Sequence, residues 1–284
     1  MKVTWGAHLS LWAADSSATS VTGAIDEAAR HGLDFVQVSL TSMPPSDAPI
    51  VRQRLRERGL SCIAGLGLPP GAAPPEAPAR AVEVLSRAVD TCGILGASLL
   101  SGAIYTPLGY RGGGAPKRKD IELTADVLRT VARYAGARGI GLGVEPLNRY
   151  ETSLINTVTQ ALELIELVGE SNVVVQLDTF HMNIEELGFA RAIRDAGERL
   201  GFVQLCESDR GVPGTGNVDW AGVFKGLRSI DYEGPLALES FNSANRALVS
   251  ATCLWRDVVG DPNVFVDNAL RYLRACLEGE TGSC

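Results

Sequence analysis

The chain has 284 residues, of which 45% are hydrophobic and 21% charged, with a net charge of −7 and a pI near 5.1. This composition is typical of a soluble globular protein, and the negative charge argues against nucleic acid or an anionic membrane as the main partner. No stretch reaches the roughly 18 apolar residues that a membrane span needs, and the N-terminus lacks a secretory signal pattern. The six scattered cysteines include no CxxC pair, which indicates reduced thiols in a cytoplasmic protein.

Eight short apolar runs predict eight strands along the chain. They are residues 4–12, 34–40, 61–68, 97–105, 140–147, 172–180, 201–208 and 235–241. Segments with helical periodicity separate these runs. They include residues 24–32, 81–96, 125–139 and 159–169. Because strands followed by crossover helices form parallel sheets, eight such units predict an α/β fold, a single (β/α)8 TIM barrel domain. A doubly wound open sheet is the alternative.

The barrel is expected to span residues 1–277, with residues 278–284 as a frayed C-terminal tail. Two long irregular stretches, 69–78 and 106–119, follow predicted strands, which places them on the face where barrel active sites lie. Residues 112–119 (GGGAPKRK) have the composition of a phosphate-binding loop. A solvated loop is the plainer interpretation, and the same segment could act as a lid.

A polar residue that could bind a metal ion recurs at the C-terminal ends of the last four predicted strands. The four are Glu145 in LGVEPL, Asp178 in VVQLDTF, Gln204 in FVQLCE and Glu239 in LALESF. Because these strand ends face the active site of a barrel and the strands are adjacent, we expect the side chains to converge. Buried carboxylates repel one another and are costly to ionise, and a divalent cation offsets both penalties. An oxygen-only ligand set favours Mn²⁺, with Mg²⁺ or Co²⁺ as alternatives, over structural Zn²⁺. The opposing interpretation is that each residue caps a helix or pairs with an arginine.

Other polar residues lie near predicted strand ends. They are His8, Glu151, His181, Glu207 and Arg210. His181 follows Asp178 by three residues, at the expected rim of the site, which favours a functional role. Arg210 is a surface charge, a ligand for a substrate hydroxyl, or the partner of Glu207 in ordering a loop. His8 either lines the pocket or is a core histidine.

Four longer motifs contain most of these residues. They are VEPLNRYETSLINT (144–157), LDTFHMNIEE (177–186), ESDRGVPGTGNVDW (207–220) and LALESF (236–241). On these motifs and on CLWRDVVGD (253–261), the sequence resembles the xylose isomerase-like barrels, in particular the ketose 3-epimerases of the D-tagatose and D-allulose group. The resemblance covers most of the chain and is strongest from about residue 140 onward.

This resemblance implies a role for each matching residue. Glu145, Asp178 and Glu239 would bind the metal, and Glu145 and Glu239 would also be the two catalytic carboxylates. Residues His181, Arg210 and Glu151 would position the ketose around its first carbons and carbonyl group. We add Glu207 and His8 as candidate substrate contacts.

Position 204 departs from the pattern of the resemblance. Epimerases of this group usually carry a histidine as metal ligand on the seventh strand, whereas glutamine is a feature of the related hydroxypyruvate isomerases. The amide oxygen of Gln204 can still bind a metal, so we expect it to be the fourth ligand. The departure puts the substrate in doubt more than the fold or the metal.

The predicted reaction inverts C3 of a ketose by two-base proton transfer through an enediolate that the metal stabilises. Because the same site can move a proton between C1 and C2, an aldose–ketose or hydroxypyruvate-type isomerase is the alternative. A non-catalytic sugar-binding relative is a further one. A zinc endonuclease is disfavoured by three histidines and a negative net charge. The expected partners are a small sugar and, by the resemblance, further copies of the chain in a dimer or tetramer, with no nucleic acid and no membrane.

Overall fold

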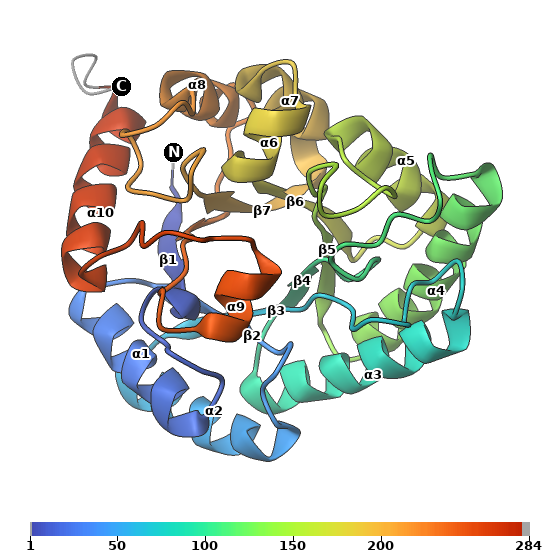
Figure 1. Ribbon diagram of the computed structural model, residues 1–284, viewed down its shortest axis with the longest axis horizontal. Coiled ribbons are helices and arrows are strands. Elements are labelled where there is room, and N and C mark those ends of the chain that lie inside the picture. Colours follow the sequence, from blue (N-terminus) through green and yellow to red (C-terminus); the bar gives the residue numbers. More distant parts are fainter. Residues whose placement is uncertain (1, 280–284) are drawn as a thin grey trace.

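Eight parallel strands form a closed barrel in the computed structural model, which describes residues 2–279 (Figure 1). The strands are β1 Thr4–His8, β2 Phe35–Ser39, β3 Ser61–Gly65, β4 Leu99–Gly102, β5 Gly141–Val144, β6 Val173–Asp178, β7 Leu200–Leu205 and β8 Pro235–Leu238. Each strand pairs with the next, and β1 closes the barrel against β8. The predicted (β/α)8 barrel is therefore confirmed, and the open sheet is wrong.

Helices surround the barrel as an outer ring, apart from α9 (Arg246–Ala251), which is drawn over the barrel (Figure 1). The other helices are α1 Ala18–Arg30, α2 Ala48–Arg58, α3 Pro78–Leu95, α4 Arg118–Gly136, α5 Val158–Val168, α6 Thr179–Glu185, α7 Phe189–Ala196, α8 Trp220–Ser229 and α10 Pro262–Glu278. Three short 3-10 helices complete the described elements: η1 Leu9–Leu11, η2 Pro45–Asp47 and η3 Gly197–Arg199. Among the described residues, no helix has the length and apolar character needed to cross a membrane.

The predicted tail and cysteines are only partly covered by the structure. Glu278 still belongs to α10 and Gly279 ends this helix, whereas residues 280–284 lie outside the described part of the chain. Cys62, Cys92, Cys206 and Cys253 are free thiols. Cys276 is disulfide-bonded, so the expectation of reduced cysteines is wrong for this residue.

The barrel interior changes from apolar to polar along the strands. Phe35 of β2 and Phe202 of β7 lie with ring centroids 6.2 Å apart, although their strands are not neighbours, so the contact crosses the interior. Side chains two residues apart on a strand share a face. The next inward residue after Phe202 is therefore Gln204, and Glu239 stands two residues after Ala237, a member of the same apolar cluster. This switch places the polar residues at the C-terminal mouth of the barrel.

The long loop after β4 lies against the loop after β5. Gly109 donates its backbone N–H to the carbonyl of Glu151 at 2.6 Å, and Ser153 donates to the carbonyl of Tyr110 at 3.0 Å. Arg111 donates to the carbonyl of Tyr150 at 2.9 Å. These bonds tie residues 106–117 to the segment that carries Glu151, at the same end of the barrel as the strand-end carboxylates.

Candidate active site

Three acidic side chains from different strands meet at the mouth of the barrel. Glu145 directly follows β5, Asp178 is the last residue of β6, and Glu239 directly follows β8. All three are buried, with exposed fractions of 7%, 1% and 7%. Asp178 has a ligand atom within 4.8 Å of one on Glu145 and one on His181, and also within 4.8 Å of atoms on Cys206 and Glu239. The structure thus brings together the three carboxylates that the strand pattern singled out.

The two carboxylate oxygens of Asp178 have different environments. Oδ1 accepts a hydrogen bond of 2.9 Å from the backbone N–H of Phe180, which caps the N-terminus of α6. Oδ2 is buried and has no hydrogen-bond partner among the described residues. A buried anionic oxygen without a partner is costly, so Oδ2 is a free ligand atom in the site.

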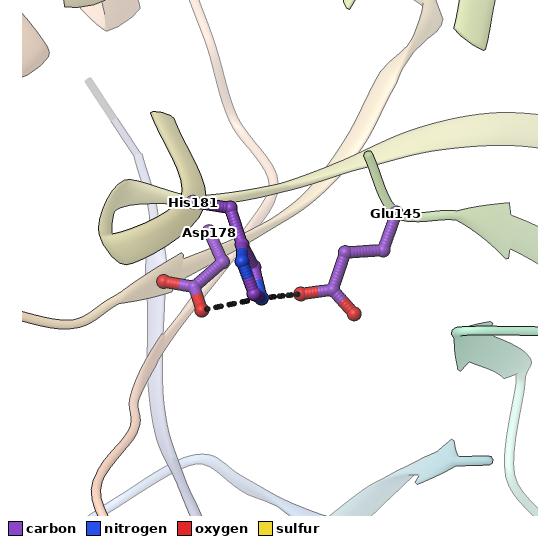
Figure 2. A group of neighbouring side chains, drawn as sticks. All are labelled: Glu145, Asp178 and His181. Atoms are coloured by element: carbon purple, nitrogen blue, oxygen red, sulfur yellow. Dashed lines mark ion pairs between the residues drawn. The ribbon is translucent and has the colours of Figure 1, made fainter. Parts of the chain in front are cut away.

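His181 presents a defined nitrogen to two of these carboxylates (Figure 2). Its Nδ1 accepts hydrogen bonds from the backbone N–H of Asn148 at 3.1 Å and from Nδ2 of Asn148 at 2.9 Å. In the neutral ring the proton therefore sits on Nε2, which lies 3.6 Å from Oδ2 of Asp178 and 3.8 Å from Oε1 of Glu145. Burial and the Arg210 charge hold the pKa of His181 well below its usual value, which keeps the ring neutral. His181 thus offers an N–H donor, and this tautomer does not suit metal ligation through Nε2.

Arg210 is the cationic side chain of the cluster. Its Nη1 donates to Oε2 of Glu239 at 2.7 Å and lies 3.6 Å from Oδ2 of Asp178. The guanidinium Cζ lies 3.9 Å from the ring centroid of Phe180 and 4.7 Å from that of Phe241, so the cation also interacts with two aromatic faces. Arg210 is 4% exposed and has a φ of 63°, a conformation that non-glycine residues rarely adopt. The surrounding structure therefore holds Arg210 in place, and of the three alternatives for this residue the surface charge is excluded.

When all three carboxyl groups are ionised, the charges of this cluster do not balance without a further cation. Burial, together with the charges of Asp178 and Glu239, raises the pKa of Glu145 well above its usual value. Burial and the charge of Glu239 likewise raise the pKa of Asp178. Three buried carboxylates face the single positive charge of Arg210, and Oδ2 of Asp178 has no partner. Oxygen donors and excess negative charge fit a hard divalent cation bound by Glu145, Asp178 and Glu239.

Two further candidates lie at the rim of this cluster. Glu151 accepts a hydrogen bond of 2.9 Å from Nδ2 of Asn148, the same amide that contacts His181. Burial raises the pKa of Glu151. His8 is buried, and burial lowers its pKa. The charge of Glu239 acts to raise this pKa, and the charge of Arg210 acts to lower it. The site environment thus includes both residues.

Glu207 is directed into its own loop. Its carboxylate accepts four hydrogen bonds, from the backbone N–H groups of Ser208 (2.8 Å), Gly214 (2.9 Å) and Val218 (3.0 Å) and from Nε1 of Trp220 (2.9 Å). These bonds saturate both oxygens. Such an arrangement favours a role in shaping the β7–α8 loop over the substrate contact that the sequence led us to expect.

Gln204 is buried beside Glu239, but its amide oxygen is turned away from that carboxylate. Nε2 of Gln204 donates to Oε1 of Glu239, and Oε1 of Gln204 accepts from Nε2 of Gln176. Ligation of a metal by the amide oxygen of Gln204 stays a prediction.

Several residues of the site were missed in the sequence. Asn148 orients both His181 and Glu151, and Phe180 and Phe241 pack on Arg210. All three lie inside the motifs VEPLNRYETSLINT, LDTFHMNIEE and LALESF, so their nearness to the polar residues was the available signal. Gln176 carried no such signal, because it stands inside an apolar strand.

Known proteins similar to this chain are sugar epimerases. An L-ribulose 3-epimerase from Methylomonas sp. (strain DH-1) is 37% identical over 279 residues, which cover 96% of this chain and 97% of the relative. An L-ribulose 3-epimerase from Mesorhizobium japonicum is 33% identical over 281 residues, 96% of this chain and 94% of the relative. The crystal structure of a D-allulose 3-epimerase from Methylomonas sp. in complex with D-allulose superimposes with a TM-score of 0.91 at 36% identity, covering 96% of each chain.

These similarities confirm the predicted resemblance to ketose 3-epimerases and support an isomerase that acts on sugars. The family model described as xylose isomerase-like TIM barrel matches residues 25–274. The chain therefore belongs to the xylose isomerase-like TIM barrel family.

Proposed function

We propose that this protein is a divalent-metal-dependent ketose 3-epimerase in which Glu145 and Glu239 are the two proton-transferring bases. The observation that carries the proposal is the pair of buried glutamates that follow β5 and β8, with Asp178 between them in strand order. Inversion at a carbon next to a carbonyl requires one group to remove a proton and a second group to return it on the other face. Two glutamates that follow different strands of the barrel would supply these groups.

The substrate proposed is a free ketose. Relatives named L-ribulose 3-epimerase, and a structural neighbour with D-allulose bound, support a ketopentose or ketohexose. A phosphate group would need a free basic side chain. Arg210 is already held by Glu239 and lies near Asp178, so it is poorly placed to bind a phosphate.

The remaining candidate residues would position the sugar or hold the loop beside it. Nε2–H of His181 can donate to a substrate oxygen, because Asn148 keeps Nδ1 as an acceptor. Arg210 can donate to a hydroxyl or carbonyl oxygen through its Nε, which is buried and without a partner among the described residues. Glu151 and His8 would contact the sugar from the rim, and Glu207 would hold the β7–α8 loop.

The metal would be held by Glu145, Asp178 and Glu239, with the amide oxygen of Gln204 as the predicted fourth ligand. Mn²⁺ is the proposed ion, with Mg²⁺ or Co²⁺ as alternatives, because all of these ligands are oxygen donors. When bound, such an ion supplies positive charge that stabilises the negative charge which develops on the ketone oxygen as C3 loses its proton. Cytoplasmic location and assembly into a homo-oligomer remain predictions.

Proton NMR in D₂O tests the proposed reaction. The protein, with Mn²⁺ added during incubation and removed before the spectra, is given free ketopentoses, ketohexoses, their phosphates and hydroxypyruvate. Deuterium at C3 of a free ketose together with formation of its epimer, both lost with EDTA, is the expected result. Exchange confined to C1 or C2 would contradict the proposal and favour the isomerase alternative.

A further inference from the structure

The loop that connects β5 to α5 carries Glu145, Asn148 and Glu151 of the candidate site and is largely buried. Most loops lie at the surface, where water satisfies their backbone polar groups. In this loop, however, Leu147, Asn148 and Ile155 are each exposed by 2% or less. The backbone groups of the segment therefore need hydrogen-bond partners within the protein.

The hydroxyl of Tyr105 is such a partner, and it acts at both ends of the loop. Tyr105 is fully buried, and its hydroxyl donates to the carbonyl of Glu145 at 2.9 Å and to that of Ile155 at 2.9 Å. Because a phenol has one proton, the two carbonyl groups share it. The backbone N–H of Leu147 also donates to the carbonyl of Ile155, at 3.1 Å. These bonds join residues 145 and 155 across the base of the loop.

The Glu145 carbonyl lies beyond the paired residues of its strand. Pairing of β5 with β4 and with β6 ends at Val144. Gly102, the partner of Val144 on β4, has a φ of 103°, and β4 ends at this residue. Tyr105 stands three residues further along the chain and directs its hydroxyl back to the end of β5. A side chain from the segment after β4 thus takes the place of a ladder hydrogen bond at Glu145.

We propose that Tyr105 is a positioning residue for Glu145, the proposed base that follows β5. Its hydroxyl fixes the backbone of Glu145, and the buried ring does not reach the surface of the site. A displacement of about 1 Å at a reacting group can cost about 10²-fold in rate. A group that fixes the backbone of a base can therefore control the rate without contacting the sugar. This inference rests on the proposed function, in which Glu145 transfers the C3 proton.

Glu151, the proposed sugar contact on the same loop, is held by separate bonds. Gly109 donates its backbone N–H to the Glu151 carbonyl at 2.6 Å, and Nδ2 of Asn148 donates to the Glu151 carboxylate at 2.9 Å. Loss of the Tyr105 hydroxyl leaves both of these bonds in place. The loss should therefore disturb Glu145 more than Glu151, and proton transfer more than sugar binding.

The substitution Tyr105→Phe tests this role, because it removes the hydroxyl and keeps the buried ring. We expect kcat to fall by about 10-fold or more and the KM for the ketose to change by less than about threefold. Exchange of the C3 proton with D₂O should slow more for the epimer whose exchange Glu145→Gln stops. An unchanged kcat, or equal slowing for the two epimers, would overturn the positioning role.

The matched control is Tyr232→Phe. Tyr232 is also buried, and its hydroxyl also donates to a backbone carbonyl, that of Pro235 at 3.0 Å. Pro235 begins β8, so this bond lies at the opposite end of the barrel from Glu145. Both variants should unfold at a lower urea concentration than the wild type, but Tyr232→Phe should leave kcat unchanged. An equal fall of kcat in the two variants would indicate a merely structural role for Tyr105.

Hydrogen–deuterium exchange, followed by mass spectrometry, reports the state of the loop without turnover. In the metal-free wild type we expect peptides that cover residues 145–157 to exchange slowly. They should exchange at least about threefold faster in Tyr105→Phe and at the wild-type rate in Tyr232→Phe. Fast exchange in the wild type, or an unchanged rate in Tyr105→Phe, would overturn the inference. A protein without epimerase activity would still give this result, so failure of the inference and failure of the proposed function are distinguishable.

Discussion

Arg210 and Glu239 form a buried ion pair in which Nη1 donates to Oε2 over 2.7 Å. The guanidinium lies against the rings of Phe180 and Phe241, and the hydroxyl of Ser240 donates to the Arg210 carbonyl. Because both partners are buried, neither can exchange the other for water. The pair therefore couples the stability of the barrel mouth to the orientation of a proposed catalytic base.

Removal of the cation from this pair should destabilise the protein strongly. We expect Arg210→Met to lower the free energy of unfolding by about 3–5 kcal/mol in the presence of a chelator, because it leaves a buried charge unpaired. Arg256→Met is the control, since Arg256 pairs with Asp209 at 2.8 Å but is 69% exposed; it should cost about 0–1 kcal/mol. Urea unfolding measures both values, and an equal loss in the two variants would contradict the importance of burial.

Substitution of the two proposed bases should affect the two epimers of the sugar differently. Glu145→Gln and Glu239→Gln should each lower epimerisation by at least about 10²-fold, because a carboxamide cannot accept the proton. Any residual exchange of the C3 proton with D₂O should be confined to one epimer in the first variant and to the other epimer in the second. Proton NMR of each pure epimer measures this. Residual exchange on the same epimer in both variants would rule out two bases on opposite faces.

The stabilisation produced by a metal should increase with pH. Burial and neighbouring carboxylates raise the pKa of Glu145 above 4.5 in the folded protein. A raised folded-state pKa gives a contribution to stability that is full below the unfolded pKa and is lost as the pH rises through the folded pKa. The metal-free protein should therefore lose this contribution above about pH 4.5, whereas a cation competes with the proton and restores stability.

Thermal unfolding with EDTA and with Mn²⁺, over a series of pH values, measures the effect. We expect the difference in Tm between the two conditions to widen as the pH rises above about 4.5. Asp178→Asn removes one proposed ligand and should diminish that difference. A difference that does not vary with pH would argue against binding of the ion by these carboxylates.

The carboxylate of Glu207 should matter for the loop rather than for the sugar. Glu207→Gln replaces an acceptor of four hydrogen bonds by a group that can no longer accept all of them, and should lower the free energy of unfolding by about 1–3 kcal/mol. Glu163→Gln, at an exposed position of α5, is the control. A raised KM for the ketose with unchanged stability would instead indicate direct contact with substrate.

The sequence by itself determined the barrel and the positions of its carboxylates. The spacing of apolar residues that marks a strand or a helix is a local property of the sequence. The eight apolar runs therefore located all eight strands. The residues at which these runs become polar, Glu145, Asp178 and Glu239, follow or end β5, β6 and β8. In a closed parallel barrel those ends share one mouth, and their convergence follows from topology alone.

Only the tertiary structure decided which atom each side chain presents to the site. The tautomer of His181 depends on Asn148, 33 residues away in the chain. The role of Glu207 depends on four donors of a folded loop. Hydrogen bonds between distant residues are satisfied in three dimensions and leave no periodic signal in the sequence, because each partner is fixed by the packing of the whole barrel.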